Sequence, residues 1–342
     1  MSVLSEKETP SDTAPAARRS RAGSVDLANR YGLLVVWAAV IVFFGVLRPD
    51  SFLTWSNFAA MFGSQAALVV LSSGLLIALR CGDYDMSIGG VMTLSAMTVA
   101  VLNAQHGVNI WVCVALAAAI GVTVGLVNGF VSVFFDINPF IVTLGTGTVY
   151  TGLALWLSDS QTISGVSTDL VNVVIGTRWL GVPLAFYFGL GACLIVLYLF
   201  ERTSLGKRML FVGKSRTVAH LSGIRVDRVR VIGFALSALF AALAGVVYVG
   251  TLGGADPTSG SSYLMPAFAA AFLGSAAIKP GLFNPIGALI AVYFLVTGIS
   301  GLSILGFASF VQDLFYGSAL VLAVALSRLV AKRRARVAAA RA

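Results

Sequence analysis

The stretch IWVCVALAAAIGVTVGLVNGFVSVFF, residues 110–135, decides the fold class of this chain. It includes no charged side chain, and about 20 apolar residues are enough for a helix to cross the hydrocarbon core of a bilayer. The stretch lacks the alternation of apolar and polar residues that marks the strands of a membrane barrel. In lipid every backbone amide must find its partner within the protein, so we predict a membrane-spanning α-helix here.

Three glycines recur at every fourth position of this stretch: Gly121, Gly125 and Gly129. Residues four apart lie on the same face of a helix. Small side chains on one face let the backbone of a second helix approach closely. These glycines therefore predict a tight packing contact between helices, and they say nothing about what the protein binds.

The rest of the chain repeats the pattern of long apolar runs. It is 58% hydrophobic and 11% charged, whereas soluble proteins carry roughly 25% charged residues. We therefore expect an all-α, polytopic membrane bundle of about ten transmembrane helices. Residues 282–326 are too long for one helix, and Gly298, Gly301 and Gly306 mark the expected turn. The predicted spans are residues 31–47, 58–79, 86–102, 110–135, 139–157, 182–200, 231–251, 263–278, 282–301 and 302–326.

Basic residues fall almost entirely on one side of such a bundle. Of the 23 lysines and arginines, 21 lie in the tails and in the connections of one side, against Arg48 and Arg178 on the other. Cytoplasmic loops of membrane proteins carry such an excess. We predict that both termini are cytoplasmic and that the chain is a multi-pass protein of a bacterial inner membrane.

The domain organisation follows from these spans. Residues 1–30 are polar and predict a disordered cytoplasmic tail, with no separate cleavable signal peptide before the first span. Residues 31–327 form the predicted transmembrane domain, and residues 328–342 a basic cytoplasmic tail. Within the domain, residues 158–181 predict an external cap, and residues 201–230 the largest cytoplasmic loop.

Catalytic and metal chemistry have no support in the sequence. The three cysteines and two histidines show no disulfide framework and no metal-ligand spacing. Gly213, Lys214 and Ser215 resemble the end of a phosphate-binding loop, but Arg208 stands where that motif needs its first glycine. We expect no catalytic residue, no metal and no cofactor in this chain. The basic residues are spread over loops, which argues against nucleic acid.

Neutral polar side chains within or beside the spans are the candidates for lining a path for a polyhydroxyl solute. Their alternative role is hydrogen bonding between neighbouring helices, which is common in membrane bundles. The spans are otherwise almost free of charge and are expected to hold no buried charge pair; Asp313 is the main exception. A functional Asp313 would favour a secondary carrier. The candidates are Gln65, Asn128, Asn138, Thr143, Thr146 and Gln312.

The loop at residues 201–230 is the most informative segment. Ser215 is a predicted helix N-cap, Arg216–Leu221 a short helix and Gly223 its stop. Such a helix suits a membrane subunit that receives motion from a motor protein; the alternative is a helix held at the membrane surface by anionic lipid. The residues expected to make the motor contact are Lys214, Arg216, Ala219, His220, Leu221, Ser222 and Gly223.

From about Asn57 onward, three motifs resemble the permease subunits of ribose/xylose-type sugar ABC importers. Gly82-Asp-Tyr-Asp-Met-Ser-Ile-Gly89 is similar to the family's Gly-Gly-x-Asp-Leu-Ser-x-Gly turn. Asn138-Pro-Phe-Ile-Val-Thr-Leu-Gly-Thr146 is similar to its Pro-Pro-Phe-Ile-x-Thr-Leu-Gly-Thr segment. Ala219-His-Leu-Ser-Gly-Ile224 corresponds to its coupling region, where the family is usually acidic and this chain has Lys214, Ser215 and Arg216.

The resemblance implies a transporter subunit and not an enzyme. It implies import of a small polar solute, a monosaccharide by analogy, with ATP hydrolysed by separate ATPase subunits on the cytoplasmic side. It also implies a periplasmic binding protein and a second permease chain, identical or different, in membrane lipid. A secondary carrier or facilitator for a small solute is the alternative function.

Overall fold

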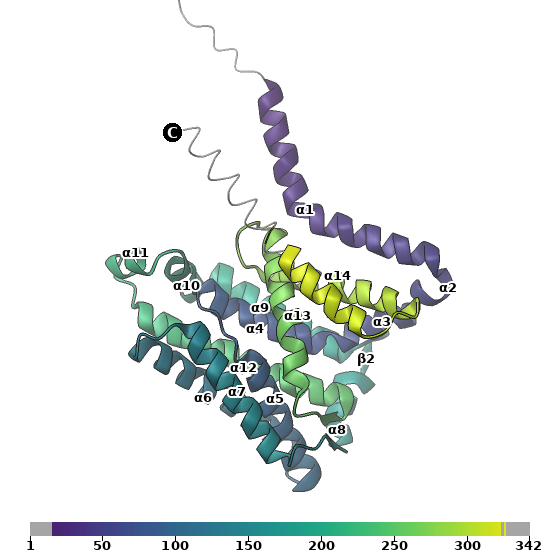
Figure 1. Ribbon diagram of the computed structural model, residues 1–342, viewed down its shortest axis with the longest axis vertical. Helices are drawn as coiled ribbons and strands as arrows, with labels where there is room; N and C mark the ends of the chain where they lie inside the picture. Colours follow the sequence, from purple (N-terminus) through teal and green to yellow (C-terminus); the bar gives the residue numbers. More distant parts are fainter. Residues whose placement is uncertain (1–15, 323–324, 326–342) are drawn as a thin grey trace, which may run out of the picture.

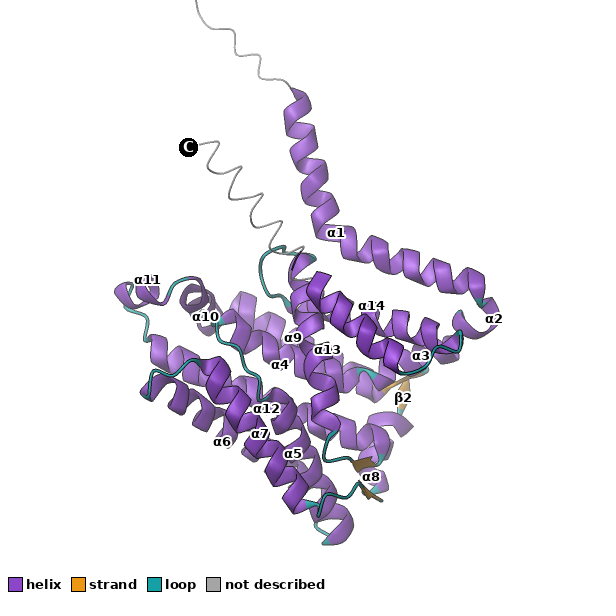
Figure 2. Cartoon of the chain, viewed as in Figure 1, coloured by secondary structure: helices purple, strands orange, loops and turns teal. Residues whose placement is uncertain are grey.

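Over the residues that the structure describes, the chain folds as a bundle of α-helices with four very short strands (Figure 1). This computed structural model describes residues 16–322 and residue 325. Figure 2 shows that the strands are confined to one end of the described bundle. The helices are α1 (Ala16–Leu47), α2 (Pro49–Phe52), α3 (Trp55–Ser64), α4 (Ala66–Arg80), α5 (Ile88–Ala100), η1 (Val101–Gln105), α6 (Ile110–Phe134), α7 (Pro139–Leu157), α8 (Thr168–Val171), η2 (Asn172–Gly176), α9 (Leu184–Arg202), α10 (Ser204–Lys214), α11 (Arg216–Leu221), α12 (Val226–Leu252), α13 (Ser259–Ala276) and α14 (Pro285–Ile304).

Each predicted span overlaps at least one helix, but fewer helices meet the length and apolarity that a span requires. Six helices of the described residues do so, or seven if α3 and α4 form one bent span. The apolar helices Tyr31–Leu47 and Phe310–Leu322 are shorter. The structure therefore supports a polytopic helical membrane protein, while the count of ten and the side of the termini stay predictions.

The N-terminal tail differs from its prediction over half its length. Residues 16–30 are helical and run without a break into the apolar part of α1. They are rich in alanine and arginine, which favour helices, and extending an existing helix avoids the cost of nucleation. The predicted tail at residues 1–15 and the basic tail at residues 328–342 lie outside the described residues.

Two span predictions are refined by the backbone. The predicted span 58–79 is two helices, α3 and α4, bent by 43° at Gln65. The bend falls beside Gly63, where the ring of Pro183 leaves no room for a Cβ atom. The turn predicted near three glycines forms around Gly306, whose φ is +85°, whereas Gly298 and Gly301 lie inside α14.

Three helices form the centre of the bundle. Residues 66–79 of α4 and every residue of α5 are buried, and α12 is buried along much of its length. A helix that is apolar on all sides is stable only where other helices surround it. The sequence of α5, with its small and apolar side chains and only Thr93, Ser95 and Thr98 as polar groups, meets that condition.

The three regularly spaced glycines of α6 face α12. A Cβ atom on Gly125 would lie 2.6 Å from the Cα of Ala235, and one on Gly129 would lie 2.8 Å from the Cα of Val231. On Gly121 it would lie 2.6 Å from the Cβ of Ala242. The two backbones therefore touch along this seam, and no larger side chain fits.

The segment at residues 158–181 forms a small cap at the end of the bundle opposite α10 and α11 (Figure 1). It contains α8, η2 and two of the strands. Strand β1 (Ile163–Ser164) pairs antiparallel with β4 (Gly254–Ala255), and β2 (Arg178–Trp179) pairs with β3 (Val182–Pro183). These two pairings fix the cap to the helices that follow it in the chain.

Candidate functional site

The loop helices α10 and α11 begin with hydroxyl caps. The Thr203 side chain accepts a hydrogen bond from the Gly206 amide at 3.1 Å, and the Ser215 side chain accepts one from the Val218 amide at 3.3 Å. Such caps satisfy amides that a helix start leaves free. The predicted cap at Ser215 and the predicted bounds of the helix that follows it are confirmed.

Two arginines and one carboxylate meet where the loop joins the bundle. Asp83 follows α4 and accepts hydrogen bonds from Arg230 Nε at 2.9 Å and from Arg230 Nη2 at 3.1 Å. Arg216, the first residue of α11, donates to Asp83 Oδ1 at 2.6 Å. The side chains of Asp83 and Arg230 are 1% and 5% exposed. Burying an ionised carboxylate without a partner is very costly, and here the two guanidinium groups compensate the charge of Asp83.

This cluster corrects the expectation that the bundle holds no buried charge pair. The pair forms between residues that each follow or begin an apolar helix, Asp83 after α4 and Arg230 in the first turns of α12. Each residue taken alone is a loop charge, and the fold brings them together although they are 147 positions apart.

A second buried carboxylate lies two residues further along the chain. Asp85 accepts hydrogen bonds from the Ser87 hydroxyl at 2.6 Å, from the Ser87 amide at 3.1 Å and from the Ser237 hydroxyl at 2.9 Å. Asn128 donates to Ser87 Oγ at 2.8 Å, and the Tyr150 hydroxyl donates to Asn128 Oδ1 at 3.1 Å. We call these five residues the Asp85 network.

The Asp85 network joins four helices at the start of α5. Burial raises the pKa of the Asp85 carboxyl above its ordinary value, and the hydrogen bonds from Ser87 and Ser237 oppose that rise. Asn128 comes from α6, Tyr150 from α7 and Ser237 from α12. Polar groups that are linked in a buried chain hold their helices in one arrangement, since moving any of them leaves a partner unsatisfied.

The residues predicted for motor contact lie on one protruding element. Ala219 is the fully buried residue of α11. The other predicted contact residues are exposed, and Leu221 keeps 81% of its surface. These exposed residues are Lys214, Arg216, His220, Leu221, Ser222 and Gly223.

The candidate path residues are distributed over several places. Asn128 and Thr143 are completely buried; Asn128 belongs to the Asp85 network, and Thr143 Oγ1 accepts from the Met86 amide at 2.9 Å. In this conformation both fill the alternative role of hydrogen bonding between elements. Asn138 is exposed and caps α7, where its side chain accepts from the Phe140 amide at 3.0 Å.

The other three path candidates are half-buried, and of these Thr146 alone reaches the Asp85 network, through a side-chain hydrogen bond with Tyr150. Thr146 bonds within its own helix, to the carbonyl of Thr143 at 3.4 Å. Gln65 lies at the bend between α3 and α4, and its amide contacts the Ser64 hydroxyl at 3.5 Å. Gln312 lies in the helix Phe310–Leu322, beside the exposed Asp313.

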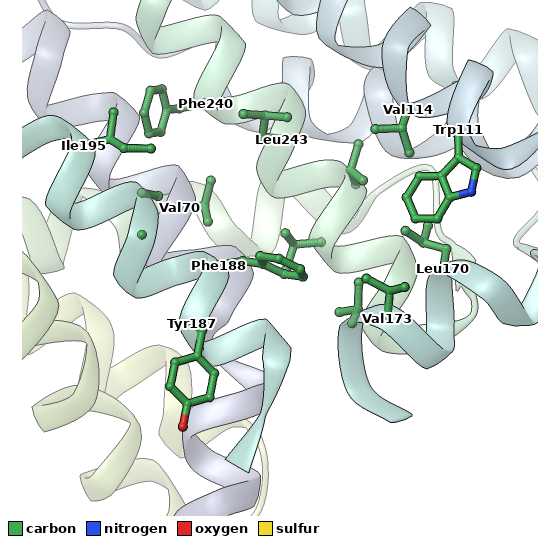
Figure 3. A pocket seen from close by; sticks show the side chains of 15 residues that line it. Val70, Trp111, Val114, Leu170, Val173, Tyr187, Phe188, Ile195, Phe240 and Leu243 are labelled. Carbon is green, nitrogen blue, oxygen red and sulfur yellow. The ribbon is translucent and has the colours of Figure 1, made fainter. Parts of the chain in front are cut away.

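Two cavities of similar size differ in chemistry. One, of about 380 Å³, lies between α4, α6, α9, α12 and the η2 turn and is lined mostly by apolar side chains such as Val70, Phe188 and Phe240 (Figure 3). The other, of about 420 Å³, lies beside α11 and is lined by polar groups of Asp83, Asp136 and Arg216. Only the second offers several hydrogen-bonding groups to a polar molecule.

Among the described residues, no group of three histidine, cysteine or acidic side chains could hold a metal ion. The residues that sequence reasoning missed are Asp83, Asp85 and Arg230. A signal for the first two was present, because two carboxylates in a short turn between apolar runs must be paired or hydrogen-bonded once buried. Nothing in the sequence identifies Arg230 as their neighbour.

Comparison with known proteins identifies the family to which the chain is similar. Residues 57–324 match the family described as "Branched-chain amino acid transport system / permease component". The chain is 31% identical over 305 residues to the D-allose transport system permease protein of Escherichia coli (strain K12), covering 89% of this chain and 93% of that protein. No solved structure matches the chain.

Two further relatives are similar over nearly their whole length. The ribose import permease protein of Bacillus subtilis (strain 168) is 32% identical over 290 residues, covering 84% of this chain and 89% of that protein. The L-arabinose transport system permease protein of Escherichia coli (strain K12) is 29% identical over 308 residues, covering 90% of this chain and 92% of that protein.

Proposed function

Because the chain belongs to the permease family of the branched-chain amino acid transport system type, we propose that it is the membrane subunit of an ATP-driven sugar importer in a bacterial inner membrane. The chain conducts the solute, and a separate ATPase subunit hydrolyses ATP. The family supports the first part. The second follows from the ABC importer family that the sequence motifs resemble.

The proposed substrate class rests on one observation. The family description names branched-chain amino acids, but the three relatives described above are named for D-allose, ribose and L-arabinose. All three alignments cover at least 84% of this chain, so the similarity includes the spans and not only a shared loop. A small polyhydroxyl solute is therefore the substrate class that the relatives favour over an apolar amino acid.

The protruding loop helices are the proposed docking site for the ATPase. Leu221 and Val218 on α11 are 81% and 56% exposed. Helix α11 lies at the end of the bundle (Figure 1), and its exposed neighbours in the sequence include the charged residues Lys214 and Arg216. Exposed apolar side chains that are rimmed by polar ones mark sites of protein association. The basic residues of this loop support a cytoplasmic position, and the cap at the opposite end would then face a periplasmic binding protein.

The proposed importer is tested by transport in a reconstituted system. Proteoliposomes that hold this chain and the ATPase that co-purifies with it are supplied with the binding protein, ATP and radiolabelled ribose, allose, arabinose or leucine. We expect ATP-dependent uptake of one of the sugars and no uptake of leucine. The control is an ATPase variant that binds ATP without hydrolysing it.

Two outcomes would contradict the proposal, and they do so separately. Uptake of leucine without uptake of any sugar would contradict the proposed sugar substrate but would be consistent with an ATP-driven importer. Sugar uptake that continues undiminished with the inactive ATPase would overturn the importer and favour a secondary carrier.

A further inference from the structure

The loop helices are joined to the α4–α5 turn by direct backbone contact. Gly213, in the last turn of α10, lies against this turn so closely that a Cβ atom would collide with the carbonyl oxygen of Arg80. A Cβ atom on Gly82 would lie 3.2 Å from the Cα of Gly213. No side chain separates the two backbones at this contact, so a displacement of α10 and α11 acts directly on the α4–α5 turn.

An ion pair provides a second connection at the same place. Arg230 holds Asp83 with two hydrogen bonds and is buried with it. The Arg216 side chain is 46% exposed and adds a second guanidinium to a carboxylate that Arg230 already neutralises. Breaking the contact with Arg216 therefore leaves no uncompensated buried charge, whereas breaking the one with Arg230 removes the buried partner. The Arg216 contact is the reversible one.

The turn that receives both contacts is bound to the surrounding helices. Thr143 of α7 accepts a hydrogen bond from the Met86 amide at 2.9 Å, and its hydroxyl lies within donating distance of the Pro139 carbonyl at 2.8 Å and of the Tyr84 carbonyl at 3.1 Å. The Asp85 network ties the next residues to α6, α7 and α12. A shift of Asp83 by a pull on Arg216 thus reaches the first turn of α5 and three neighbouring helices through packed and hydrogen-bonded groups.

We infer that Arg216 is a positioning residue for energy coupling: its ion pair with Asp83 transmits the displacement of α11 to the Asp85 network at the start of α5. The inference rests on the proposed function, because it needs an ATPase that moves α11. It concerns two residues at which this chain differs from the motifs of the resembling family, a glycine position occupied by Asp83 and an acidic segment that here contains Arg216. In this ion pair the cation, Arg216, belongs to the loop helices and the anion, Asp83, belongs to the helix bundle.

The test measures solute moved for each ATP hydrolysed by the complete transporter in proteoliposomes. The variants are Arg216→Ala and the conservative Arg216→Lys, and the matched control is Arg228→Ala, an exposed arginine at the start of α12 that lies outside α10 and α11. For Arg216→Ala we expect the ratio of transport to hydrolysis to fall about fivefold or more, the lower limit of a typical coupling between sites, with ATP hydrolysis retained. Arg216→Lys should restore most of the ratio, and Arg228→Ala should match the wild type.

A second measurement does not depend on transport. Hydrogen exchange of residues 82–90 in the full complex should change between the nucleotide-free and ATP-bound states in the wild type, and that change should disappear in Arg216→Ala. An unchanged ratio and an unchanged exchange response in Arg216→Ala would overturn the inference. Loss of ATPase binding in Arg216→Ala would also overturn it, since Arg216 would then be a docking residue. Absence of ATP-dependent uptake in the wild type would count against the proposed function instead.

Discussion

At the end of the bundle that carries α10 and α11, carboxylates meet guanidinium and ammonium groups, and all three ion pairs of the described residues lie there: Arg216–Asp83, Arg230–Asp83 and Lys279–Glu201. At the opposite end, the cap is held by two strand pairs and by bonds between neutral groups or from hydroxyls to Asp256. The proposed motor side is thus fixed by charge and the proposed binding-protein side by backbone pairing. Charged contacts differ from strand pairs in that their strength depends strongly on burial.

The difference indicates which end can change its contacts. A strand pair exchanges partners only when the backbone opens, whereas a half-exposed arginine side chain can break its contact with a carboxylate and form it again. The end that carries α10 and α11 therefore has one buried ion pair, Arg230–Asp83, that stays formed. It also has one half-exposed ion pair, Arg216–Asp83, that can break and form again. The following predictions measure how far the two ends differ.

The largest effect is expected for Arg230→Met. The variant leaves Asp83 with only the half-exposed Arg216, and we expect the free energy of unfolding to fall by about 3 kcal/mol, the low end of the range for breaking a buried pair. The measurement is chemical unfolding in detergent micelles. The control is Arg228→Met, two residues earlier and exposed. Equal stabilities for the two variants would show that the Asp83 cluster does not hold the loop end.

An intermediate effect is expected at the cap from Asn103→Ala. The Asn103 side chain accepts from the Ser167 amide at 2.7 Å and donates to the Val108 carbonyl at 2.9 Å. Removing it leaves a partly buried amide unsatisfied, at a cost of about 1–2 kcal/mol. Limited proteolysis of residues 158–183 should become several-fold faster. The exposed Gln105→Ala serves as control, and equal cleavage of both variants would remove Asn103 from the contacts that hold the cap.

A small effect is expected for Lys279→Ala at the loop end. Lys279 and Glu201 form an ion pair whose side chains are 46% and 43% exposed, and pairs of this exposure contribute about 0–1 kcal/mol. The unfolding free energy should change by less than 1 kcal/mol and should not respond to added salt more than the wild type does. A loss as large as that of Arg230→Met would mean that burial does not separate the two pairs.

The smallest effect is a pH dependence at the cap. Hydrogen bonds from the Thr258 hydroxyl, and next from the Thr162 hydroxyl, hold the pKa of Asp256 below its ordinary value. The stabilisation is therefore present above the ordinary carboxyl pKa and is lost as the pH falls through the lowered pKa of the folded state. The protection of the β1 and β4 amides against hydrogen exchange, corrected for the intrinsic pH dependence of the exchange rate, should decrease in that acidic range. Asp256→Asn should abolish the dependence; if it persists, another group is responsible.

The positions of the helices were predicted well because they depend on local sequence, namely on apolar runs that are bounded by polar turns. The predicted span at residues 139–157 has the bounds of α7, and Arg216–Leu221 has those of α11. The bend at Gln65 was missed because it lies within an uninterrupted apolar run and coincides with a contact to Pro183, more than a hundred residues away. Local patterns hold no information on such a contact.

The site was predicted less completely than the fold for the same reason. The loop residues are contiguous and could be recognised as a group. Asp83 and Arg230 had to be matched across 147 positions, and Arg230 looked like one more cytoplasmic charge that orients the bundle. Asn128 and Thr143 could be named as polar residues, but whether a polar side chain faces a path or a neighbouring helix is decided by the rotation of its helix within the bundle.

The glycine seam between α6 and α12 has a consequence for the order in which the protein is made. Roughly 90 residues separate the end of α6 at Phe134 from the start of α12 at Val226, and at about 5–20 residues per second the ribosome needs about 5–20 s to supply them. During that interval α6 resides in the bilayer before its partner exists. The face of α6 that later packs on α12 contains Gly121, Gly125 and Gly129, whose backbone groups are already hydrogen-bonded within the helix. Until α12 has been made, lipid chains can cover this shallow face of α6 without leaving a backbone group unsatisfied.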